Sequence, residues 1–334
     1  MAVRLKDIAE LIGVSVNTVS RALKDKPDIG EKTRQRIKEA AAALGYRPDL
    51  NARSLVLQKT STIGLAVTES DNPVRMEFCE KLRQRAERDG YRILTTSLRY
   101  KWDADNMAAV EELLARRVDG LIIGALWQVS GEYVLGKLLQ DCKSNRIPVV
   151  LFGLPGELDA DCVEIDLEES AYRLTRHLID KGYRDIAFVL NTDKDYKFTG
   201  YRQAMLEAGL KEYIRLIPLP ACRMEPAYHA MNRYLDSGGK LPQAIIAGND
   251  LGALGFLSAL REHGIDVPGQ CAVAGVDNIE FGKFSCPPLT TIGFDNGACA
   301  EAVWNLMRQR LTQKENTPAV QIAVPQTLIP RQST

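Results

Sequence analysis

Residues 5–23 read LKDIAELIGVSVNTVSRAL, a stretch whose apolar residues have the spacing of two short helices around a turn. The first helix presents one apolar stripe, made of Leu5, Ile8, Ala9 and Ile12. Gly13 follows and provides the backbone freedom that a sharp turn needs. Ser15 is placed to cap the second helix, because its hydroxyl oxygen can accept an amide hydrogen from the first turn.

The second helix has an inner and an outer face. The inner face is made of Val19, Ala22 and Leu23, and the outer face near its start is made of Val16, Asn17 and Arg21. In the major groove of DNA, asparagine can pair with adenine, arginine with guanine, and valine can contact a thymine methyl group. The outer face therefore favours a DNA reader of the helix-turn-helix type. An ordinary amphipathic hairpin with a solvated polar face explains these few positions equally well.

The charge of the chain is unevenly distributed. The whole chain has 43 basic and 43 acidic residues. Residues 1–59 hold twelve Lys and Arg against seven acids, and the rest of the chain holds 31 against 36. A basic head on an acidic body is expected of a DNA-binding head joined to a ligand-binding body. Chance can produce an excess of this size, so the asymmetry only supports the DNA-binding hypothesis.

The composition is that of an ordinary folded protein with more than one unit. A chain of 334 residues suggests two or three compact units. No apolar run approaches the roughly 18 residues of a membrane helix, and the start, MAVRLKDIAE, lacks the apolar core of a signal peptide. Seven cysteines are scattered without a CxxC pair, which favours reduced thiols. We therefore expect a cytoplasmic protein.

The residues after the hairpin predict a third helix and then a linker. A loop covers residues 25–30, the helix covers about 31–44, and Gly45 stops it. One face of this helix is made of Thr33, Ile37, Ala40, Ala41 and Leu44. The segment NARSLVLQK, from Asn51, is partly basic and has too few apolar residues to form a stable helix alone, so we expect a hinge.

From Thr62 on, short apolar runs alternate with amphipathic segments. The runs predicted as strands are TIGLAVT, YRILTTS, DGLIIGAL, IPVVLFG, DIAFVLN, YIRLIPL, QAIIAG, QCAVAGV and TTIGF, with short returns in VQIAVPQTLIPR. The helices predicted between them cover about 74–89, 104–117, 132–145, 199–208, 226–236, 251–264 and 297–311. This order predicts parallel sheets with helices on both faces, in two lobes of the same type.

Seven stretches, in order along nearly the whole chain, resemble the lactose-repressor (LacI/GalR) family of bacterial transcription regulators. They are LKDIAELIGVSVNTVSRAL, KTRQRIKEAAAALGYRP, NARSL, GNDLGALG, GVDNIEF, PPLTTI and LIPRQST. Each is weak by itself, but seven in the family's order are specific. The resemblance implies an α/β fold, with an N-terminal helix-turn-helix DNA-binding head and a two-lobed core like that of periplasmic binding proteins.

The resemblance also implies a division of the chain. The head covers residues 1–47 and the hinge 48–60, the N-lobe of the core covers 61–160 and 292–321, and the C-lobe covers 161–291 and 322–334. We expect a homodimer that binds a near-palindromic DNA operator. An effector, a sugar or sugar derivative, is expected in the cleft between the lobes, where it changes operator affinity. No leucine heptad supports a coiled-coil tetramer.

In the family, the start of the second helix enters the major groove, which implies base contacts for Val16, Asn17 and Arg21. Phosphate contacts are implied for Ser15, Thr18, Thr33 and Tyr46. In the hinge, Ala52 and Leu55 are implied at the minor groove, with Leu55 as the wedge at the operator centre. Without DNA, Leu55 can instead pack on the core. Gly30 stands at a cap position usually held by Ser, which costs little.

Ligands of open parallel sheets bind at the carboxyl ends of the strands. Asn249 and Asp250 follow the strand QAIIAG, and Asp277 and Asn278 follow CAVAGV. Amide and carboxylate groups can divide donors and acceptors among ligand hydroxyls, and the resemblance implies effector contacts for Asn249 and Asp277. For Asp250, a helix cap is at least as good an interpretation.

The cleft departs from the family pattern at two positions. Lys197 stands where the family usually has an arginine, and it lacks the planar fork of that residue, so it is either an effector ligand or simply solvated. Cys222 stands where many relatives have a stacking aromatic residue. Trp127 is then a candidate for the ring, with rim packing as the ordinary alternative. Ser70 and Asp71 are candidates because they follow the first core strand.

Other classes of protein are less well supported. GNDLGALG does not have a nucleotide-binding spacing, and the three histidines (His177, His229 and His263) lack neighbours spaced for a metal or a nucleophile. We therefore expect no enzyme, no cofactor and no metal. A transport binding protein would share the body but not residues 1–59. A regulator whose cleft no longer responds to an effector stays an alternative, given Lys197 and Cys222.

Overall fold

The structure is a computed structural model. It describes residues 3–46, 59–68, 71–99, 103–124, 132–153, 159–190, 195–220, 222–313 and 317–334. The chain divides into two compact units, Met1–Thr60 and Ser61–Thr334. Each unit is described by itself.

The first unit is a three-helix head. It contains α1 (Leu5–Ile12), α2 (Val16–Ala22) and α3 (Glu31–Ala43). Gly13 has a φ of 77°, and the Ser15 hydroxyl accepts the Thr18 amide hydrogen at 3.1 Å, so the turn and the cap are confirmed. The buried core of the head is made of Ile8, Ala9, Val19, Ala22, Ile37, Ala40 and Ala41. The prediction for Leu44 was wrong: α3 ends at Ala43, and Leu44 is 38% exposed because it already belongs to the turn.

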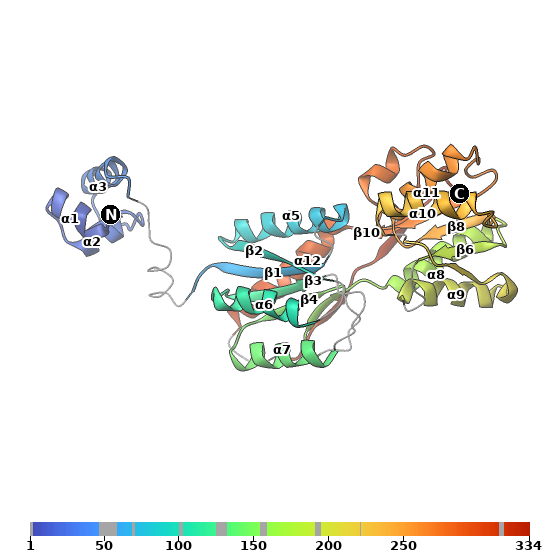
Figure 1. Ribbon diagram of the computed structural model, residues 1–334. Coiled ribbons are helices and arrows are strands. Elements are labelled where there is room, and N and C mark those ends of the chain that lie inside the picture. The colour runs from blue at the N-terminus through green and yellow to red at the C-terminus, as the bar shows by residue number, and fades with distance from the viewer. Residues whose placement is uncertain are drawn as a thin grey trace. The chain divides into compact units, whose positions relative to one another are not determined.

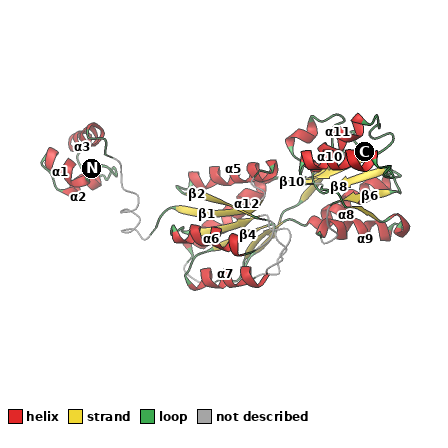
Figure 2. Ribbon diagram, in the orientation of Figure 1, coloured by secondary structure: helices red, strands yellow, loops and turns green. Residues whose placement is uncertain are grey.

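The second unit contains two six-stranded sheets (Figures 1 and 2). The first sheet has the order β11-β5-β4-β3-β1-β2 and the second β12-β10-β9-β8-β6-β7. The strands of the first sheet are β1 (Thr62–Thr68), β2 (Arg92–Leu98), β3 (Gly120–Gly124), β4 (Val149–Phe152), β5 (Asp161–Glu164) and β11 (Gln321–Ala323). Those of the second are β6 (Ile186–Val189), β7 (Arg215–Ile217), β8 (Ala244–Ala247), β9 (Ala272–Val276), β10 (Thr290–Phe294) and β12 (Gln326–Ile329). The β10–β12 pair is antiparallel and the other pairs are parallel.

Helices cover both faces of each sheet (Figure 1). On the first sheet they are α5 (Pro73–Arg88), α6 (Ala104–Ala115), α7 (Glu132–Ser144) and α12 (Asn296–Thr312), and on the second α8 (Leu167–Asp180), α9 (Tyr196–Glu207), α10 (Met224–Asp236) and α11 (Asp250–Glu262). Successive side chains of β1 point to opposite faces of the sheet. Leu65 packs with buried residues of α5 and α12 on one face, and Ala66 packs with buried residues of α6 and α7 on the other. None of the described helices is long and apolar enough to cross a membrane.

Three strands lie wholly or partly in a different sheet from the one their expected lobe implies. β11 continues to Ala323, past the expected boundary at 321, yet it pairs with β5 in the first sheet. β5 begins at Asp161, yet it pairs with β4 and β11 in the first sheet. β10 continues to Phe294, yet it pairs with β9 and β12 in the second. A strand joins its sheet as a whole, so the chain crosses between the lobes after Glu164, after Phe294 and again between Ala323 and Gln326. The sequence prediction also missed β5 and α8.

Candidate functional site

The outer face of α2 is open to solvent. Asn17 and Arg21 are exposed, and the Val16 side chain is 44% exposed despite being apolar. The Ser15 and Thr18 hydroxyls lie 2.9 Å apart at the start of the helix. The residues predicted to read bases therefore share one accessible surface, with two hydroxyl groups at its edge.

Arg21 has a partner that the sequence analysis did not foresee. Its Nε donates a hydrogen bond to the Asp28 carboxylate at 2.7 Å. This bond lowers the pKa of Asp28 and raises that of Arg21. Asp28 lies seven residues after Arg21, and a loop lies between them. Helix periodicity therefore cannot predict this pair, which depends on the fold of the loop.

The remaining predicted DNA contacts are only partly accessible. Thr33, in the first turn of α3, and Tyr46 are both half-buried. Tyr46 packs against the head core, and its amide hydrogen bonds to the Ala41 carbonyl at 2.9 Å. Gly30 is the cap residue of α3, as expected, and has no side-chain cap bond. Ala52 and Leu55 lie outside the described residues.

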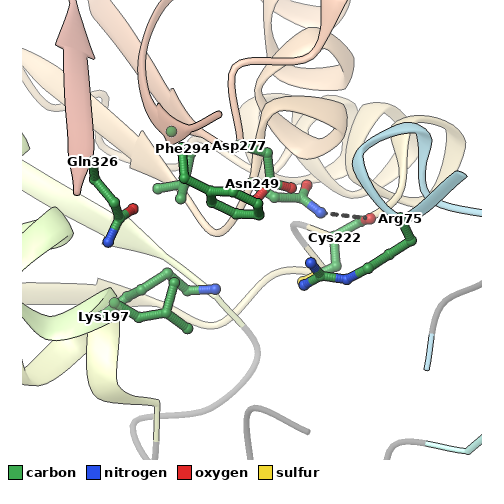
Figure 3. A pocket seen from close by; sticks show the side chains of 10 residues that line it. Arg75, Lys197, Cys222, Asn249, Asp277, Phe294 and Gln326 are labelled. Atoms are coloured by element: carbon green, nitrogen blue, oxygen red, sulfur yellow. Dashed lines mark hydrogen bonds between the residues drawn. The ribbon is translucent and has the colours of Figure 1, made fainter. Parts of the chain in front are cut away.

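A pocket lies at the carboxyl ends of β8, β9 and β10 of the second sheet, and Arg75 of α5 reaches it from the helices of the first sheet (Figure 3). It is lined by Arg75, Leu167, Lys197, Cys222, Asn249, Val276, Asp277, Gly293, Phe294 and Gln326. Phe294 is the last residue of β10, and Gln326 is its partner on the antiparallel strand β12. The amino end of β12 therefore contributes to the same edge as the carboxyl end of β10.

Asn249 reaches the pocket but is already bonded at both ends of its amide. Its Oδ1 accepts the Gly252 amide hydrogen at 3.0 Å. Its Nδ2 donates to the Cys222 carbonyl at 3.1 Å, the bond that Figure 3 draws as a dashed line. Asn249, rather than Asp250, is thus the cap of α11. The capping interpretation of Asp250 was wrong, because the helix begins one residue earlier than that interpretation requires.

Asp250 instead holds the loop that carries Asp277. It is completely buried and accepts hydrogen bonds from the Ile279 amide at 2.9 Å and the Thr291 hydroxyl at 2.6 Å. Burial, and then the nearby charge of Asp277, raise the pKa of Asp250 well above its usual range. Because Asp250 is the first residue of α11, one of these bonds joins α11 to the loop at Ile279 and the other joins α11 to β10 at Thr291.

The backbone at Asp277 has an uncommon conformation. Asp277 has a φ of 113° and Asn278 a φ of 53°, both in the region that favours glycine. Gly293 lies against this loop: a Cβ atom built there would come 2.8 Å from the Asp277 carbonyl oxygen. The pocket wall is therefore a close backbone contact that only glycine at position 293 permits without a shift.

Lys197 is 9% exposed, so the simply solvated interpretation was wrong. Its Nζ lies 3.6 Å from the carboxylate of Asp195, the residue that caps α9. Asp71 does not line the pocket and instead forms an ion pair with Arg223. Ser70 and Trp127 lie outside the described residues.

The sequence analysis missed six of the ten lining residues, among them the polar or aromatic Arg75, Phe294 and Gln326. Arg75 is 2% exposed, and its guanidinium carbon lies 5.8 Å from the centre of the Phe152 ring. The signal for it was its spacing, since it lies three residues before the buried Phe78 on the same helix face. The signal for Phe294 was its position at the end of the strand TTIGF.

Arg75 and Lys197 bring two positive charges to one pocket. Figure 3 shows their charged groups reaching into the same space from opposite sides, with Asp277 contributing a carboxylate and Gln326 an amide. Such a set can bind a polar molecule that has hydroxyl groups and an acidic group. Among the described residues, no group of three His, Cys, Asp or Glu is arranged to hold a metal.

The chain is similar in sequence to known bacterial regulators. A family model described as "Bacterial regulatory proteins, lacI family" matches residues 4–49, and one described as "Periplasmic binding protein-like domain" matches residues 175–334. An HTH-type transcriptional repressor PurR of Glaesserella parasuis is 32% identical over 320 residues, which covers 94% of this chain and 92% of that protein. The PurR repressor of Haemophilus influenzae is 31% identical over 316 residues and covers 93% and 92%.

Solved structures support the same fold. A lac repressor dimer bound to operator and the anti-inducer ONPF has a TM-score of 0.85 at 23% identity, covering 100% of this chain and 99% of that chain. A complex of the transcriptional regulator CelR with cellobiose has a TM-score of 0.68 at 24% identity, covering 99% and 100%. The α/β architecture derived from the sequence is confirmed.

Proposed function

The chain belongs to the lacI family of bacterial regulatory proteins, and on this premise we propose how it works. It is a ligand-responsive DNA-binding transcriptional repressor, and relatives covering nearly its full length are repressors rather than enzymes. The observation that carries the proposal is the presence, in one chain, of an open recognition face on α2 and a polar pocket at the strand ends. The first binds an operator, and the second binds the effector that changes operator affinity.

The head reads DNA through α2. Val16, Asn17 and Arg21 contact base edges in the major groove, while Ser15, Thr18, Thr33 and Tyr46 contact phosphates. In the hinge, outside the described residues, Ala52 and Leu55 contact the minor groove. One head covers only a half-site, so two copies of the chain bind two inverted half-sites of a near-palindromic operator.

The homodimer has a supporting feature in the second lobe. Phe281 and Phe284 lie at η2 (Glu280–Lys283), and Phe284 is 80% exposed. Exposed aromatic side chains are enriched at protein interfaces, where they bury a large apolar area. We assign this aromatic pair to the surface that a second copy covers.

The effector is a small polar molecule, a sugar or sugar derivative. The charges of Arg75 and Lys197 favour a derivative that has a carboxylate or phosphate group, and Asp277 accepts hydrogen bonds from its hydroxyl groups. The lining residues come from both lobes, so a bound effector can favour one arrangement of the lobes over another, and this shift couples binding to the head.

A repressor with an effector-independent cleft is the second candidate. The buried Arg75 and the constrained loop at Asp277 favour a pocket that binds a ligand, because burying a charge and straining a backbone both cost free energy.

As a regulator of bacterial transcription, the protein would act in the cytoplasm, where the DNA lies.

Two experiments test the proposal on the full-length protein. In vitro selection from random DNA should enrich two inverted half-sites, with an affinity that falls steeply as salt rises. A thermal-shift screen should then compare neutral sugars with their acid and phosphate derivatives, since a ligand at 100 times its Kd stabilises by about 2.7 kcal/mol. Failure to enrich any DNA would contradict the repressor, and a flat screen would favour the effector-independent cleft.

A further inference from the structure

The guanidinium group of Arg21 is held from one side only. Its Nε donates to Asp28 at 2.7 Å, and within the described residues no protein acceptor is bonded to Nη1 or Nη2. These two nitrogens form the end of the planar group, and the end edge has the geometry for a bidentate contact with O6 and N7 of guanine. The bond to Asp28 thus leaves free the edge that recognises guanine.

The loop that carries Asp28 is itself anchored to α3. Arg34 donates through Nη2 to the Ile29 carbonyl at 2.8 Å and to the Lys26 carbonyl at 3.2 Å. The part of the loop next to Asp28 is anchored through these Arg34 bonds, whereas the Asp25 carboxylate pairs with Lys38 at 2.6 Å at the other end of the loop. Asp28 therefore lies on a segment that is fixed to α3. Its hydrogen bond restricts the orientation of the Arg21 guanidinium group.

We propose that Asp28 is a positioning residue that sets the base preference of Arg21, and that it selects guanine at one position of each half-site. The proposal rests on the proposed function, because it requires Arg21 to contact a base. A free arginine side chain samples many rotamers and offers several edges to the groove. Fixing its plane before binding lowers the ordering cost for guanine and removes alternative contacts with other bases.

The charge of Asp28 makes the proposal distinctive. A carboxylate on a DNA-facing surface weakens the attraction to phosphates, which depends on net positive charge. Removing the charge should therefore strengthen binding to unrelated DNA while weakening discrimination at one base pair. If Asp28 only affected overall DNA affinity or the stability of the head, its removal would not raise binding to unrelated DNA while lowering the discrimination at one base pair.

The test compares Asp28→Asn with Asp25→Asn in the full-length protein. Both changes remove one exposed negative charge from the same loop, but only Asp28 is bonded to Arg21. Asparagine is tolerated at position 25, where φ is 50°. At both positions its neutral amide is a weaker acceptor than the carboxylate, so each variant weakens one charge-assisted interaction and only the partner differs. In vitro selection with each variant, followed by measured dissociation constants for single-base changes, gives the preference at every operator position.

Asp28→Asn should reduce the preference for guanine at one position by about 2- to 10-fold, while Asp25→Asn leaves that preference unchanged. Both variants should bind unrelated DNA more tightly than the wild type. In an Arg21→Lys background, which lacks the planar fork, Asp28→Asn should cause no further loss at that position.

Three results would overturn the proposal while leaving the repressor intact: an unchanged preference in Asp28→Asn, an equal change in Asp25→Asn, or a change at a position that Arg21→Lys does not affect. The last result would make Asp28 a direct base reader. If the wild-type protein selects no DNA, the proposed function itself fails, so the two failures are distinguishable.

Discussion

Arg223 of the second lobe donates hydrogen bonds through both Nη atoms to the Asp71 carboxylate of the first lobe, one of them at 3.2 Å. In the sequence, Arg223 follows the pocket residue Cys222, and Asp71 lies four residues before the pocket residue Arg75. Both side chains are largely exposed, so the pair contributes little to folding. Because it joins residues of the two lobes, we expect the pair to favour the arrangement of the lobes in which it forms.

Breaking this pair should change how tightly the protein holds its operator. We expect Arg223→Gln and Asp71→Asn to change the operator dissociation constant in the same direction and by less than about fivefold, as exposed pairs contribute about 0–1 kcal/mol. The double variant should equal either single variant, because the interaction is lost once. Fully additive effects in a binding titration would show that the pair is not part of the switch.

Asp250→Asn should remove a pH dependence of stability. The folded-state pKa of Asp250 is raised, so its contribution to stability is complete below the unfolded value near 3.8 and is lost as pH rises through the folded value. We expect the wild type to lose unfolding free energy relative to the variant as pH rises above the unfolded value. Asparagine can still accept the Ile279 amide hydrogen and donate to the Thr291 oxygen. Equal slopes in denaturant unfolding would contradict this prediction.

Gly293→Ala should destabilise the second lobe and displace Asp277. The added Cβ would lie 2.8 Å from the Asp277 carbonyl oxygen, which forces a shift that costs about 1–3 kcal/mol. Gly282→Ala is the matched control, because its Cβ would meet the Leu289 side chain at an ordinary 3.5 Å. Thermal unfolding should show a lower Tm for the first variant only, and equal values would refute the close-contact interpretation.

Phe284→Glu should weaken self-association. A charge placed on the proposed contact surface would be desolvated in the dimer, so the dimer dissociation constant should rise by at least about tenfold. Leu206→Glu puts the same charge on the exposed Leu206 of α9 and serves as the control. Sedimentation velocity over a concentration series should separate the two variants. A dimer that tolerates Phe284→Glu would exclude this surface.

Local signals explain why the head could be predicted from sequence. The stripe of α1, the glycine turn and the serine cap all depend on residues within a few positions of one another, and each is present as expected. In the second unit, the prediction succeeded for the longer strands and helices. The prediction missed β5, because its four residues show no periodicity. It also missed α8, although the buried Leu167, Ala171, Leu174 and Leu178 have a helical spacing.

The pocket was predicted in place but not in detail. The strand-end rule selected Asn249 and Asp277, and both line the pocket, because the rule depends only on topology. It could not show that the amide of Asn249 is occupied by Gly252 and Cys222, or that Asp71 is bonded to Arg223. These partners lie on other elements, and their choice depends on packing over long sequence distances.

The three crossings between the sheets have a mechanical consequence. Because the chain passes from one lobe to the other after Glu164, returns after Phe294 and passes again before Gln326, neither lobe is a continuous segment. A protease that cut any one crossing would leave the lobes joined by the other two. The two lobes therefore stay connected by three backbone segments when they move relative to each other. Neither lobe can be produced alone by simple truncation of the chain.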